Sequence, residues 1–214
     1  MGRHIFGLIG LIGSGKNTVA DIFVEEYGFK SVAFAGALKD AVSAIFNWPR
    51  ELLEGNTEES RKFREEVDED WQSTIGHLDM FKGQKVTPRL VLQCMGTEVF
   101  RHHFHSDIWV LAVLKKMQSD KNTSYVITDA RFINEISKLR TMGGQIIRVR
   151  RGPEPEWFET AKTDNRWMAT KYPNVHSSEY SWVTTIPSYT IENDKDINHL
   201  RESVKEIMKA VDTQ

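Results

Sequence analysis

Residues 10–21 read GLIGSGKNTVAD and directly follow the apolar run IFGLI at residues 5–9. This order of strand, glycine-rich loop and amphipathic helix is typical of a phosphate-binding loop. Glycines let the backbone fold tightly around an anion, and the side chain of Lys16 can reach the outer phosphates from the helix N-terminus. A glycine-rich turn without a ligand is the alternative, which the spacing and Lys16 disfavour. The predicted phosphate-binding residues are Gly13, Ser14, Gly15, Lys16, Asn17 and Thr18.

Asn17 occupies the position where most phosphate-binding loops carry a hydroxyl side chain that ligates Mg²⁺. Its amide oxygen is also a neutral ligand, but it lies further from the backbone than a hydroxyl does. Thr18 follows directly and could supply a hydroxyl. Asn17 and Thr18 are therefore the candidate Mg²⁺ ligands, and the sequence leaves open which side chain completes the coordination of the metal.

Short apolar runs alternate with longer segments of helical period along the 214 residues, of which 40% are hydrophobic. Such alternation is typical of parallel strands connected by crossover helices, and the length fits one domain with insertions. The predicted strands cover residues 5–9, 31–35, 125–128, 145–149 and 189–191. The predicted helices cover residues 15–27, 37–47, 87–104, 107–119, 132–142 and 196–210. We therefore predict an α/β fold in which helices cover both faces of a parallel sheet, giving three α/β/α layers.

Two polar segments interrupt this alternation. Residues 50–71 carry four basic and nine acidic side chains, and residues 152–180 are polar and contain three prolines. Both segments are interpreted as insertions that stand off a single domain, which spans residues 1–214. The core is expected at residues 1–47, 87–149 and 183–214, and the insertions at about 48–86 and about 150–182.

Charge and cysteine content limit the partners and the compartment. The 28 basic and 30 acidic side chains give a net charge of −2, so no overall field attracts nucleic acid or an anionic membrane. No apolar stretch approaches the roughly 18 to 20 residues needed to cross a bilayer. The single cysteine, Cys94, cannot form an internal disulfide, which favours a reducing compartment. We expect a cytoplasmic protein that binds small molecules, and neither nucleic acid nor a membrane.

Asp129 and Arg131 follow the strand predicted at residues 125–128. Ligands of open α/β sheets bind outside the carboxyl ends of the strands. A carboxylate there can bind a metal-bound water or a sugar hydroxyl, and an arginine can bind a phosphate through bidentate hydrogen bonds from its guanidinium group. The alternative is that Asp129 caps the next helix and Arg131 lies on the surface. This pattern by itself favours neither.

Three arginines, Arg148, Arg150 and Arg151, lie where the strand predicted at residues 145–149 meets the second insertion. At the mouth of a site they could neutralise the charge on a transferring phosphoryl group. They could equally be a solvated strand end, which is the more common fate of a charge cluster. Arg151 is the candidate of the three because it is the last before the turn.

Further motifs follow along the chain, and their order indicates a protein family more specifically than the phosphate-binding loop does. They are FAGALKDAV at 34–42, LLEG at 52–55 followed by Arg61, PRLVLQCMGTE at 88–98 with DIW at 107–109, DARF at 129–132 with Asn134 and Glu135, VRRG at 149–152, and IEND at 191–194. Through them the chain resembles, over nearly its whole length, the deoxynucleoside monophosphate kinases of tailed bacteriophages, in the P-loop nucleotide kinase superfamily. The resemblance implies a P-loop NTPase fold in which the first insertion binds the nucleoside monophosphate (NMP) and the second forms a lid over ATP.

The resemblance implies transfer of the γ-phosphoryl group of ATP, with Mg²⁺, to a deoxynucleoside monophosphate (dNMP), in the cytoplasm of a host cell where a phage makes DNA precursors. It also suggests a homodimer. The loop of this family ends with an amide or carboxylate side chain followed by threonine, so Asn17 resembles a neutral variant of a family feature. The sequence does not say which bases are accepted, or whether ribose is distinguished from deoxyribose.

Carried over by position, the resemblance also implies roles for residues outside the loop. Catalytic roles fall to Lys16, Arg131 and Arg151, with Arg151 approaching the transferring group when the lid closes. Arg61 and Arg131 would hold the acceptor phosphate. The substrate-site residues are Lys39, Arg61, Gln93, Thr97, Trp109, Asp129 and Arg131.

Four of these substrate residues lie on predicted helices. Gln93 and Thr97 are four apart in the helix predicted at 87–104, so they share a face, where an amide can read a base edge. Trp109 could stack on the base, or it could pack in the core. Lys39 could instead be a solvated helix position.

Two other functions are kept as alternatives. A P-loop kinase for another small phosphorylated acceptor, such as dephospho-coenzyme A or phosphomevalonate, would share the loop, the strand-end carboxylate and the lid arginines. It would not need the region from LQCMGTE to DIW. A nucleotide-dependent switch would hold ATP or GTP for a partner to read, but the sequence contains no NKxD guanine-reading pattern.

Overall fold

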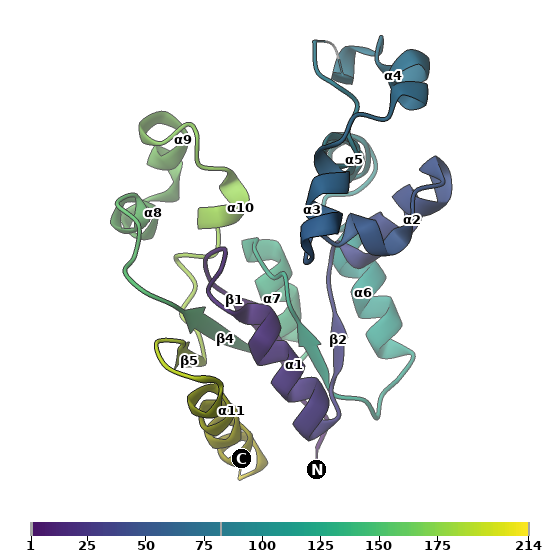
Figure 1. The fold of residues 1–214 in the computed structure, drawn as a ribbon. Coiled ribbons are helices and arrows are strands. Elements are labelled where there is room, and N and C mark those ends of the chain that lie inside the picture. Colours follow the sequence, from purple (N-terminus) through teal and green to yellow (C-terminus); the bar gives the residue numbers. More distant parts are fainter. Residues whose placement is uncertain (1, 82, 214) are drawn as a thin grey trace. The chain divides into compact units, whose positions relative to one another are not determined.

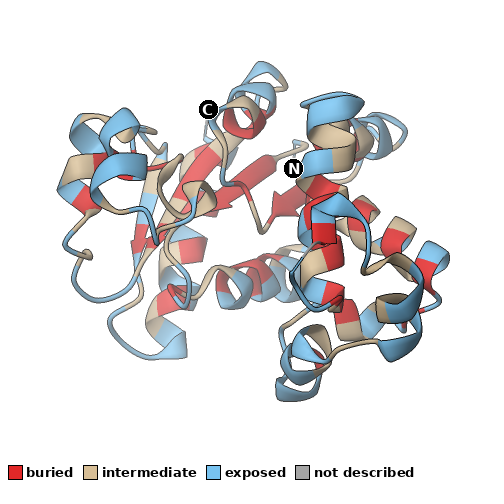
Figure 2. Cartoon of the chain, turned by 90° about the horizontal axis from the view of Figure 1, so that it is seen from above, coloured by how far each residue is buried: buried red, intermediate tan, exposed pale blue. Residues whose placement is uncertain are grey.

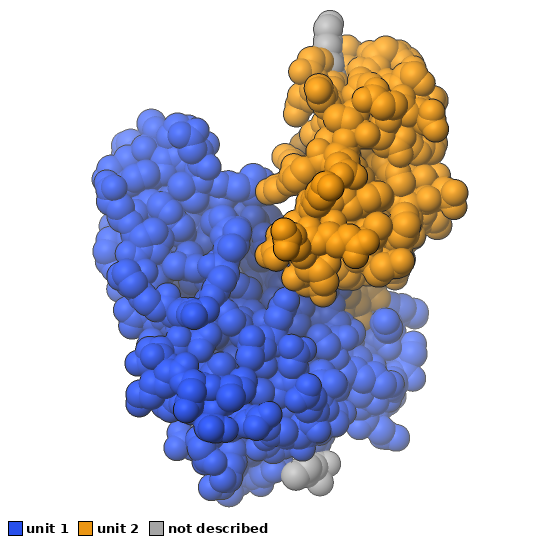
Figure 3. All heavy atoms as spheres, in the orientation of Figure 1, with its two compact units in different colours: residues 1–33, 114–214 blue, residues 34–113 orange. Residues whose placement is uncertain are grey.

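The computed structural model describes residues 2–81 and 83–213, which form two compact units. Unit 1 comprises residues 1–33 and 114–214, and unit 2 comprises residues 34–113 (Figure 3). The insertion expected at residues 48–86 lies within unit 2, and the insertion expected at 150–182 lies within unit 1. The description of the chain as one domain with insertions at these bounds stays a prediction.

Unit 1 is built on a five-stranded parallel sheet with the strand order β2-β3-β1-β4-β5 (Figure 1). The strands are β1 (Ile5–Ile9), β2 (Lys30–Val32), β3 (Tyr125–Ile127), β4 (Gln145–Arg150) and β5 (Tyr189–Glu192). Every residue of β1 is buried, because this central strand is covered on both faces. The predicted strands are all present, and only β2 ends well before its predicted end.

Helices cover both faces of this sheet, as connections between parallel strands require. α1 (Lys16–Tyr27) and α11 (Ile197–Asp212) lie on one face, and α7 (Ile133–Thr141) lies on the other (Figure 1). Gly7 in β1 lets α7 approach closely, since a Cβ added to it would lie 2.7 Å from Leu139 Cδ1. The predicted three-layer α/β/α architecture is confirmed.

The core of unit 1 forms between the sheet and the helices α1 and α11. Phe6 packs against Phe23 and Phe29, with ring-centroid distances of 5.0 and 5.5 Å. α11 contributes buried apolar side chains that recur at helical spacing, namely Leu200, Val204, Ile207, Met208 and Val211. Burial of each such side chain stabilises the fold by about 1.5–3 kcal/mol. In Figure 2, which is coloured by burial, the strands β1 and β3 are buried throughout and β4 in part, whereas the outer strands β2 and β5 are mostly intermediate or exposed.

Between β4 and β5 the chain forms several short helices. They are α8 (Phe158–Thr163), the 3₁₀-helix η4 (Asn165–Trp167), α9 (Met168–Lys171) and α10 (Ser177–Tyr180). This segment buries apolar side chains of its own, namely Phe158 and Ala161 in α8, Met168 in α9, and Trp182 after α10. The segment predicted as the lid therefore has its own helices and its own buried side chains, and its function as a lid stays a prediction.

Within the described residues, every regular element of unit 2 is a helix. After α2 (Gly36–Phe46) come η1 (Arg50–Leu53), α3 (Glu58–Glu65), α4 (Glu69–Ile75), η2 (Asp79–Phe81), α5 (Pro88–Gln93) and the π-helix η3 (Cys94–His102). α6 (Ile108–Gln118) begins in unit 2 and ends in unit 1. Side-chain caps begin three of the helices, at Thr57, Asp68 and Thr87. Within residues 2–81 and 83–213, no helix has both the length and the apolar character needed to cross a bilayer.

The helix predicted at residues 87–104 changes its hydrogen bonding along its length. It is α-helical only in α5, and from Cys94 onward it is a π-helix with i→i+5 bonds. Two tertiary contacts hold this turn at Gly96. A Cβ on Gly96 would lie 2.7 Å from Leu38 Cδ2, and its carbonyl oxygen accepts a hydrogen bond from Trp109 Nε1 at 3.0 Å. Both partners come from other parts of unit 2, so hydrophobic period alone could not predict the change.

Candidate functional site

Glycines with positive φ shape the loop between β1 and α1. Gly10, Gly13 and Gly15 have φ angles of 146°, 77° and 99°, a region that residues with side chains rarely adopt. A Cβ on Gly10 would also lie 2.2 Å from the carbonyl oxygen of Val149. The loop therefore runs close against β4 and leads directly into α1, which is the geometry expected of a phosphate-binding loop.

The N-terminus of α1 is suited to an anion. Its N-cap residue, Gly15, has no side chain, and no side chain among the described residues caps this end. The first turn also carries no acidic residue. Because the first N–H groups of a helix have no intrahelical acceptor and the helix dipole is positive there, this end fits a phosphate group.

Lys16 lies at the start of α1 and folds back over the loop. Its Nζ donates hydrogen bonds to the carbonyl oxygens of Gly10 and Leu11, at 2.7 and 2.8 Å. Burial, followed by the positive charge of Arg131, lowers the pKa of Lys16 from 10.5 to about 8. Lys16 is therefore still charged at neutral pH, but it begins to lose its charge slightly above it.

Asn17 and Thr18 follow Lys16 in the first turn of α1, and both are exposed. Their amide and hydroxyl oxygens are hard, neutral ligands of the kind that Mg²⁺ accepts beside phosphate oxygens and water. The two residues therefore fit a magnesium ion. Their assignment as its ligands stays a prediction.

Asp129 and Arg131 lie close enough to the phosphate-binding loop for their charges to shift the pKa of Lys16. Arg131 lowers this pKa and Asp129 raises it. The guanidinium of Arg131 donates to Ser178 Oγ at 3.3 Å and lies 3.6 Å from Glu179 Oε1. Both partners belong to α10 of the predicted lid. The structure thus brings the second predicted motif together with the loop and with the lid segment.

Glu135 holds the backbone that follows Asp129. The residue is only 2% exposed, and its Oε2 accepts hydrogen bonds from the N–H groups of Arg131 and Phe132, at 2.8 and 3.0 Å. The N-cap of α7 is Phe132, so the alternative in which Asp129 caps this helix is wrong. We did not predict a role for Glu135, although an acidic residue three positions after the N-cap is a recognised signal at helix starts.

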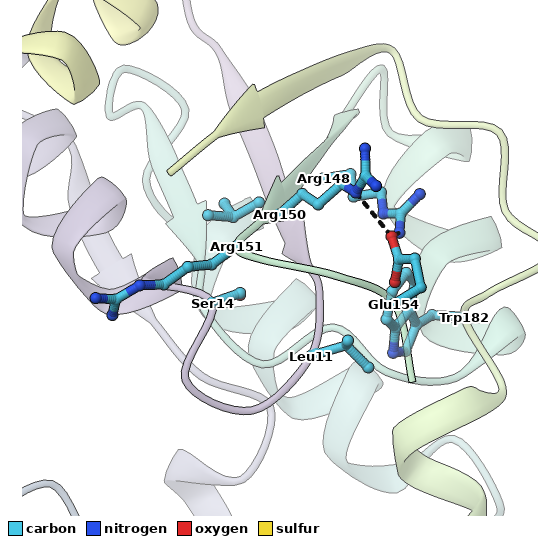
Figure 4. Close-up of a pocket in the computed structure, with 8 residues that line it drawn as sticks. Leu11, Ser14, Arg148, Arg150, Arg151, Glu154 and Trp182 are labelled. Carbon is cyan, nitrogen blue, oxygen red and sulfur yellow. Dashed lines mark hydrogen bonds and ion pairs between the residues drawn. The ribbon is translucent and has the colours of Figure 1, made fainter. Parts of the chain in front are cut away.

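Arg148 lies at the base of the predicted lid and is held there on two sides (Figure 4). It forms an ion pair with Glu154. Its guanidinium also lies over the rings of Phe158 and Trp182, at 4.9 and 5.5 Å from their centroids. Such cation–π contacts stabilise partly buried arginines by about 0.5–2 kcal/mol. Arg148 is therefore placed to hold the lid segment rather than to meet a substrate.

Arg150 and Arg151 are neighbours with different surroundings. Arg150 lies 2.9 Å from Glu154 and 3.4 Å from Glu192, so its charge is paired. Arg151 is exposed, and its side chain points away from the other two arginines (Figure 4). Arg151 is therefore the most accessible of the three to a substrate, and its catalytic role stays a prediction.

A small pocket lies between the phosphate-binding loop and the base of the lid segment (Figure 4). Leu11 and Ser14 line it from the loop, and Arg148, Glu154 and Trp182 line it from the other side. Its volume of about 10 Å³ is close to that of one water, so it cannot hold a nucleotide base. The predicted loop residue Ser14 therefore lines the same small pocket as Arg148, Glu154 and Trp182 at the base of the lid segment.

In unit 2, Lys39 belongs to a chain of ion pairs. Its Nζ donates to Glu54 Oε2 at 2.6 Å, and Arg50 donates to the other oxygen of Glu54 at 2.5 Å. Burial would raise the pKa of Glu54, but the hydrogen bonds from Lys39 and Arg50 outweigh burial and lower the pKa. The side chain of Lys39 is only 14% exposed, so it is not the solvated helix position kept as the alternative. We did not predict Glu54 as its partner, although LLEG at 52–55 was among the motifs.

Three other predicted substrate residues lie on different elements of unit 2. Arg61 is exposed on α3, and Gln93 is exposed at the end of α5. Thr97 is half-buried in η3, where the bonding is i→i+5, so the shared α-helical face expected for Gln93 and Thr97 does not apply unchanged. Their roles toward an acceptor nucleotide stay predictions.

Trp109 is buried within unit 2 and is 6% exposed. Its Nε1 donates to the carbonyl oxygen of Gly96 at 3.0 Å, and its ring meets Phe100 edge-on at a centroid distance of 5.1 Å. These are packing contacts of the kind kept as the alternative for this residue. Stacking of Trp109 on a base stays a prediction.

Comparison with known proteins identifies a family whose model matches most of this chain. A family model described as deoxynucleotide monophosphate kinase matches residues 56–204. A protein of Acanthamoeba polyphaga mimivirus, provisionally named a deoxynucleotide monophosphate kinase, is 29% identical over 163 residues, which make up 69% of this chain and 74% of the relative. The deoxynucleoside-5'-monophosphate kinase of Escherichia phage T5 is 40% identical over 55 residues, which make up 26% of this chain and 22% of the relative.

Distant similarity to solved structures spans nearly the full chain. A dephospho-CoA kinase from Campylobacter jejuni and a shikimate kinase from Aquifex aeolicus vf5 are each 14% identical to this chain, with TM-scores of 0.45. The matches cover 98% of this chain and 97% and 96% of the two structures, respectively. At these values they say nothing about the substrate.

Proposed function

Because this chain belongs to the deoxynucleotide monophosphate kinase family, and is thus a phosphotransferase, we propose that it transfers the γ-phosphoryl group of ATP to dNMPs. The products would be ADP and the deoxynucleoside diphosphate, a precursor for phage DNA synthesis. One observation supports this most strongly. The glycine loop leads into an uncapped helix N-terminus with Lys16, and the charges of Asp129 and Arg131 lie close enough to act on that lysine.

The loop and α1 would bind the polyphosphate of ATP. Backbone N–H groups of residues 13–18 donate to phosphate oxygens, and Lys16 turns from the carbonyl oxygens of Gly10 and Leu11 toward the outer phosphates. A magnesium ion, when bound, would neutralise charge on the phosphates, and Asn17 and Thr18 are the residues that would hold it. Most of the binding therefore comes from backbone geometry that the glycines make possible.

The acceptor needs placement more than activation. A nucleoside monophosphate has a second pKa near 6, so it offers an anionic oxygen at neutral pH and no strong general base is required. What must be overcome is the repulsion between two phosphate groups. Arg131 and Arg61 would hold the acceptor phosphate, and Asp129 would hold a sugar hydroxyl or a metal-bound water. The residues proposed for the acceptor nucleoside are Lys39, Gln93, Thr97 and Trp109.

Arg131 and Arg151 would act at different moments of the reaction. In this structure Arg131 is engaged by Ser178 and Glu179 of α10. An acceptor phosphate would take over this guanidinium, because a doubly charged phosphate is a stronger partner than one carboxylate. Arg151 would then approach the transferring group as the lid segment closes and excludes water, which otherwise competes as acceptor.

The test is ADP release from ATP and Mg²⁺ with single acceptors: dAMP, dCMP, dGMP, dTMP, dUMP, hydroxymethyl-dCMP and AMP. Turnover that requires particular deoxynucleotides would support the proposal and identify the accepted bases. The Lys16→Ala variant should keep its fold and lose turnover, which ties the activity to the loop. If the folded protein binds ATP but turns over none of these acceptors, the proposal is wrong and another phosphorylated acceptor must be sought.

A further inference from the structure

Asn193 stands directly after β5, at a position that the backbone fixes. β5 ends at Glu192, which pairs with Arg150 of β4 in the parallel register. The N–H group of Asn193 then donates to the carbonyl oxygen of Arg150 at 2.7 Å. The end of the sheet therefore holds the start of this side chain in place.

The side chain of Asn193 reaches the phosphate-binding loop. Its Nδ2 donates to the carbonyl oxygen of Ser14 at 2.8 Å. A Cβ added to Gly15 would lie 2.3 Å from the same Nδ2, so the amide rests directly on the Gly15 backbone. Asn193 is half-buried, and its contact joins residues 179 positions apart in the sequence.

This hydrogen bond determines the direction of a neighbouring donor. The peptide bond between Ser14 and Gly15 is planar and trans, so its C=O and N–H groups point in opposite directions. When Asn193 holds the carbonyl oxygen of Ser14, the N–H group of Gly15 must point away from Asn193. That N–H group is one of the loop donors proposed for the phosphates of ATP.

We propose that Asn193 is a positioning residue that orients the Ser14–Gly15 peptide, so that the Gly15 N–H group is directed at the phosphate before ATP binds. The inference rests on the proposed function, because it assumes that this loop binds the phosphates of a nucleotide. It gives Asn193 no contact with the substrate. Substitution of Asn193 should therefore change the affinity for ligands that carry phosphate groups and leave the affinity for the nucleoside unchanged.

The test compares a nucleotide with its nucleoside. Dissociation constants of ADP are measured by calorimetry, and those of adenosine by competition against labelled ADP, for the wild type and for Asn193→Asp. Aspartate has nearly the same shape, but it places an acceptor oxygen against the Ser14 carbonyl oxygen where the amide donated. Asn198→Asp is the matched control, because it makes the same change at an exposed position of α11. Asn193→Ala removes the donor without adding a charge.

Both Asn193 variants should weaken ADP binding at least roughly tenfold, as expected for the loss of a partly buried hydrogen bond that also disorders a donor. Adenosine affinity should not change, and Asn198→Asp should behave as the wild type. Unchanged ADP affinity in both variants would overturn the inference. An equal loss for ADP and adenosine would also overturn it, because it would mean a contact with the nucleoside or a general loss of structure. Failure of the wild type to bind ADP would instead reject the proposed function.

Discussion

At the scale of single residues, the environment of Lys16 makes its charge depend on pH near the physiological range. Burial and the nearby guanidinium of Arg131 disfavour the ammonium form, so the pKa of Lys16 falls to about 8 in the nucleotide-free protein. A bound polyphosphate has the opposite effect, because its negative charge favours the ammonium form. Nucleotide binding above pH 8 must therefore be accompanied by uptake of a proton.

The affinity for ADP should accordingly be constant from pH 7 to about 8 and then fall by up to about tenfold per pH unit. Calorimetric titrations between about pH 7 and 9.5 in buffers of different ionisation enthalpy measure both the affinity and the proton uptake. Lys16→Arg is the control, because an arginine stays charged throughout this range. The same break near pH 8 in that variant would show that Lys16 is not the titrating group.

Arg148, which lies in β4, and Arg151, which directly follows it, should respond differently to the same substitution. Arg151→Ala should lower kcat strongly and leave the free energy of unfolding within about 0.5 kcal/mol of wild type, since Arg151 is exposed. Arg148→Ala should cost about 1–3 kcal/mol of stability, because it leaves Glu154 without this partner and removes the contacts with Phe158 and Trp182. Urea unfolding and initial rates measure the two effects. Equal rates for Arg151→Ala and wild type would contradict the role proposed for Arg151.

At the scale of elements, the start of α7 positions Arg131 through its backbone. Glu135, one turn into the helix, accepts the N–H groups of both Arg131 and Phe132 and is almost fully buried. The loop after β3 is thereby tied to the helix that follows it. An element that packs against the sheet thus holds the residue that the family resemblance assigns to the acceptor phosphate.

Glu135→Ala should lower the free energy of unfolding by about 1–3 kcal/mol, because it leaves two backbone donors without their acceptor. It should also raise KM for the acceptor more than KM for ATP, since Arg131 loses its support. Urea unfolding and steady-state kinetics measure these effects. Glu206→Ala removes an exposed carboxylate from α11 and should change neither quantity. A KM for the acceptor that stays at the wild-type value would separate Glu135 from the placement of Arg131.

At the scale of the whole molecule, the proposed donor-binding residues all belong to unit 1. They are the loop residues 13–18, and both Arg151 and the positioning residue Asn193 are in the same unit. Of the residues proposed for the acceptor, Asp129 and Arg131 also belong to unit 1, and the others belong to unit 2, namely Lys39, Arg61, Gln93, Thr97 and Trp109. The two substrates should therefore leave different patterns of protection along the chain.

Hydrogen exchange followed by mass spectrometry tests this division. ADP alone should slow exchange in peptides that cover residues 10–20, which contain the phosphate-binding loop, and residues 189–196, which contain Asn193 bonded to that loop. It should leave residues 58–75 unchanged, because this segment carries Arg61, which is proposed for the acceptor. A dNMP added afterwards should slow exchange in residues 58–75. AMP in place of the deoxynucleotide serves as the comparison for sugar discrimination. Protection of residues 58–75 by ADP alone would contradict the assignment.

The sequence by itself determined the strands, the helices outside the two insertions and the phosphate-binding loop. These features depend on local properties: hydrophobic period, the spacing of Gly10, Gly15 and Lys16, and the junction of a strand with a helix. The order of the motifs along the chain also indicated the family. Among the predicted elements, only β2 and the α-to-π change at Cys94 departed clearly from the expected bounds, whereas the helices of the two insertions were not predicted.

Only the tertiary structure decided which of several similar residues is available to a ligand. Arg148, Arg150 and Arg151 have the same chemistry at nearly adjacent positions, and they differ through partners such as Glu154 and Trp182 that the fold brings to them. The contact of Asn193 with Ser14 likewise crosses most of the chain. Local pattern carries no information about such contacts, because burial and charge pairing arise only when distant segments pack together.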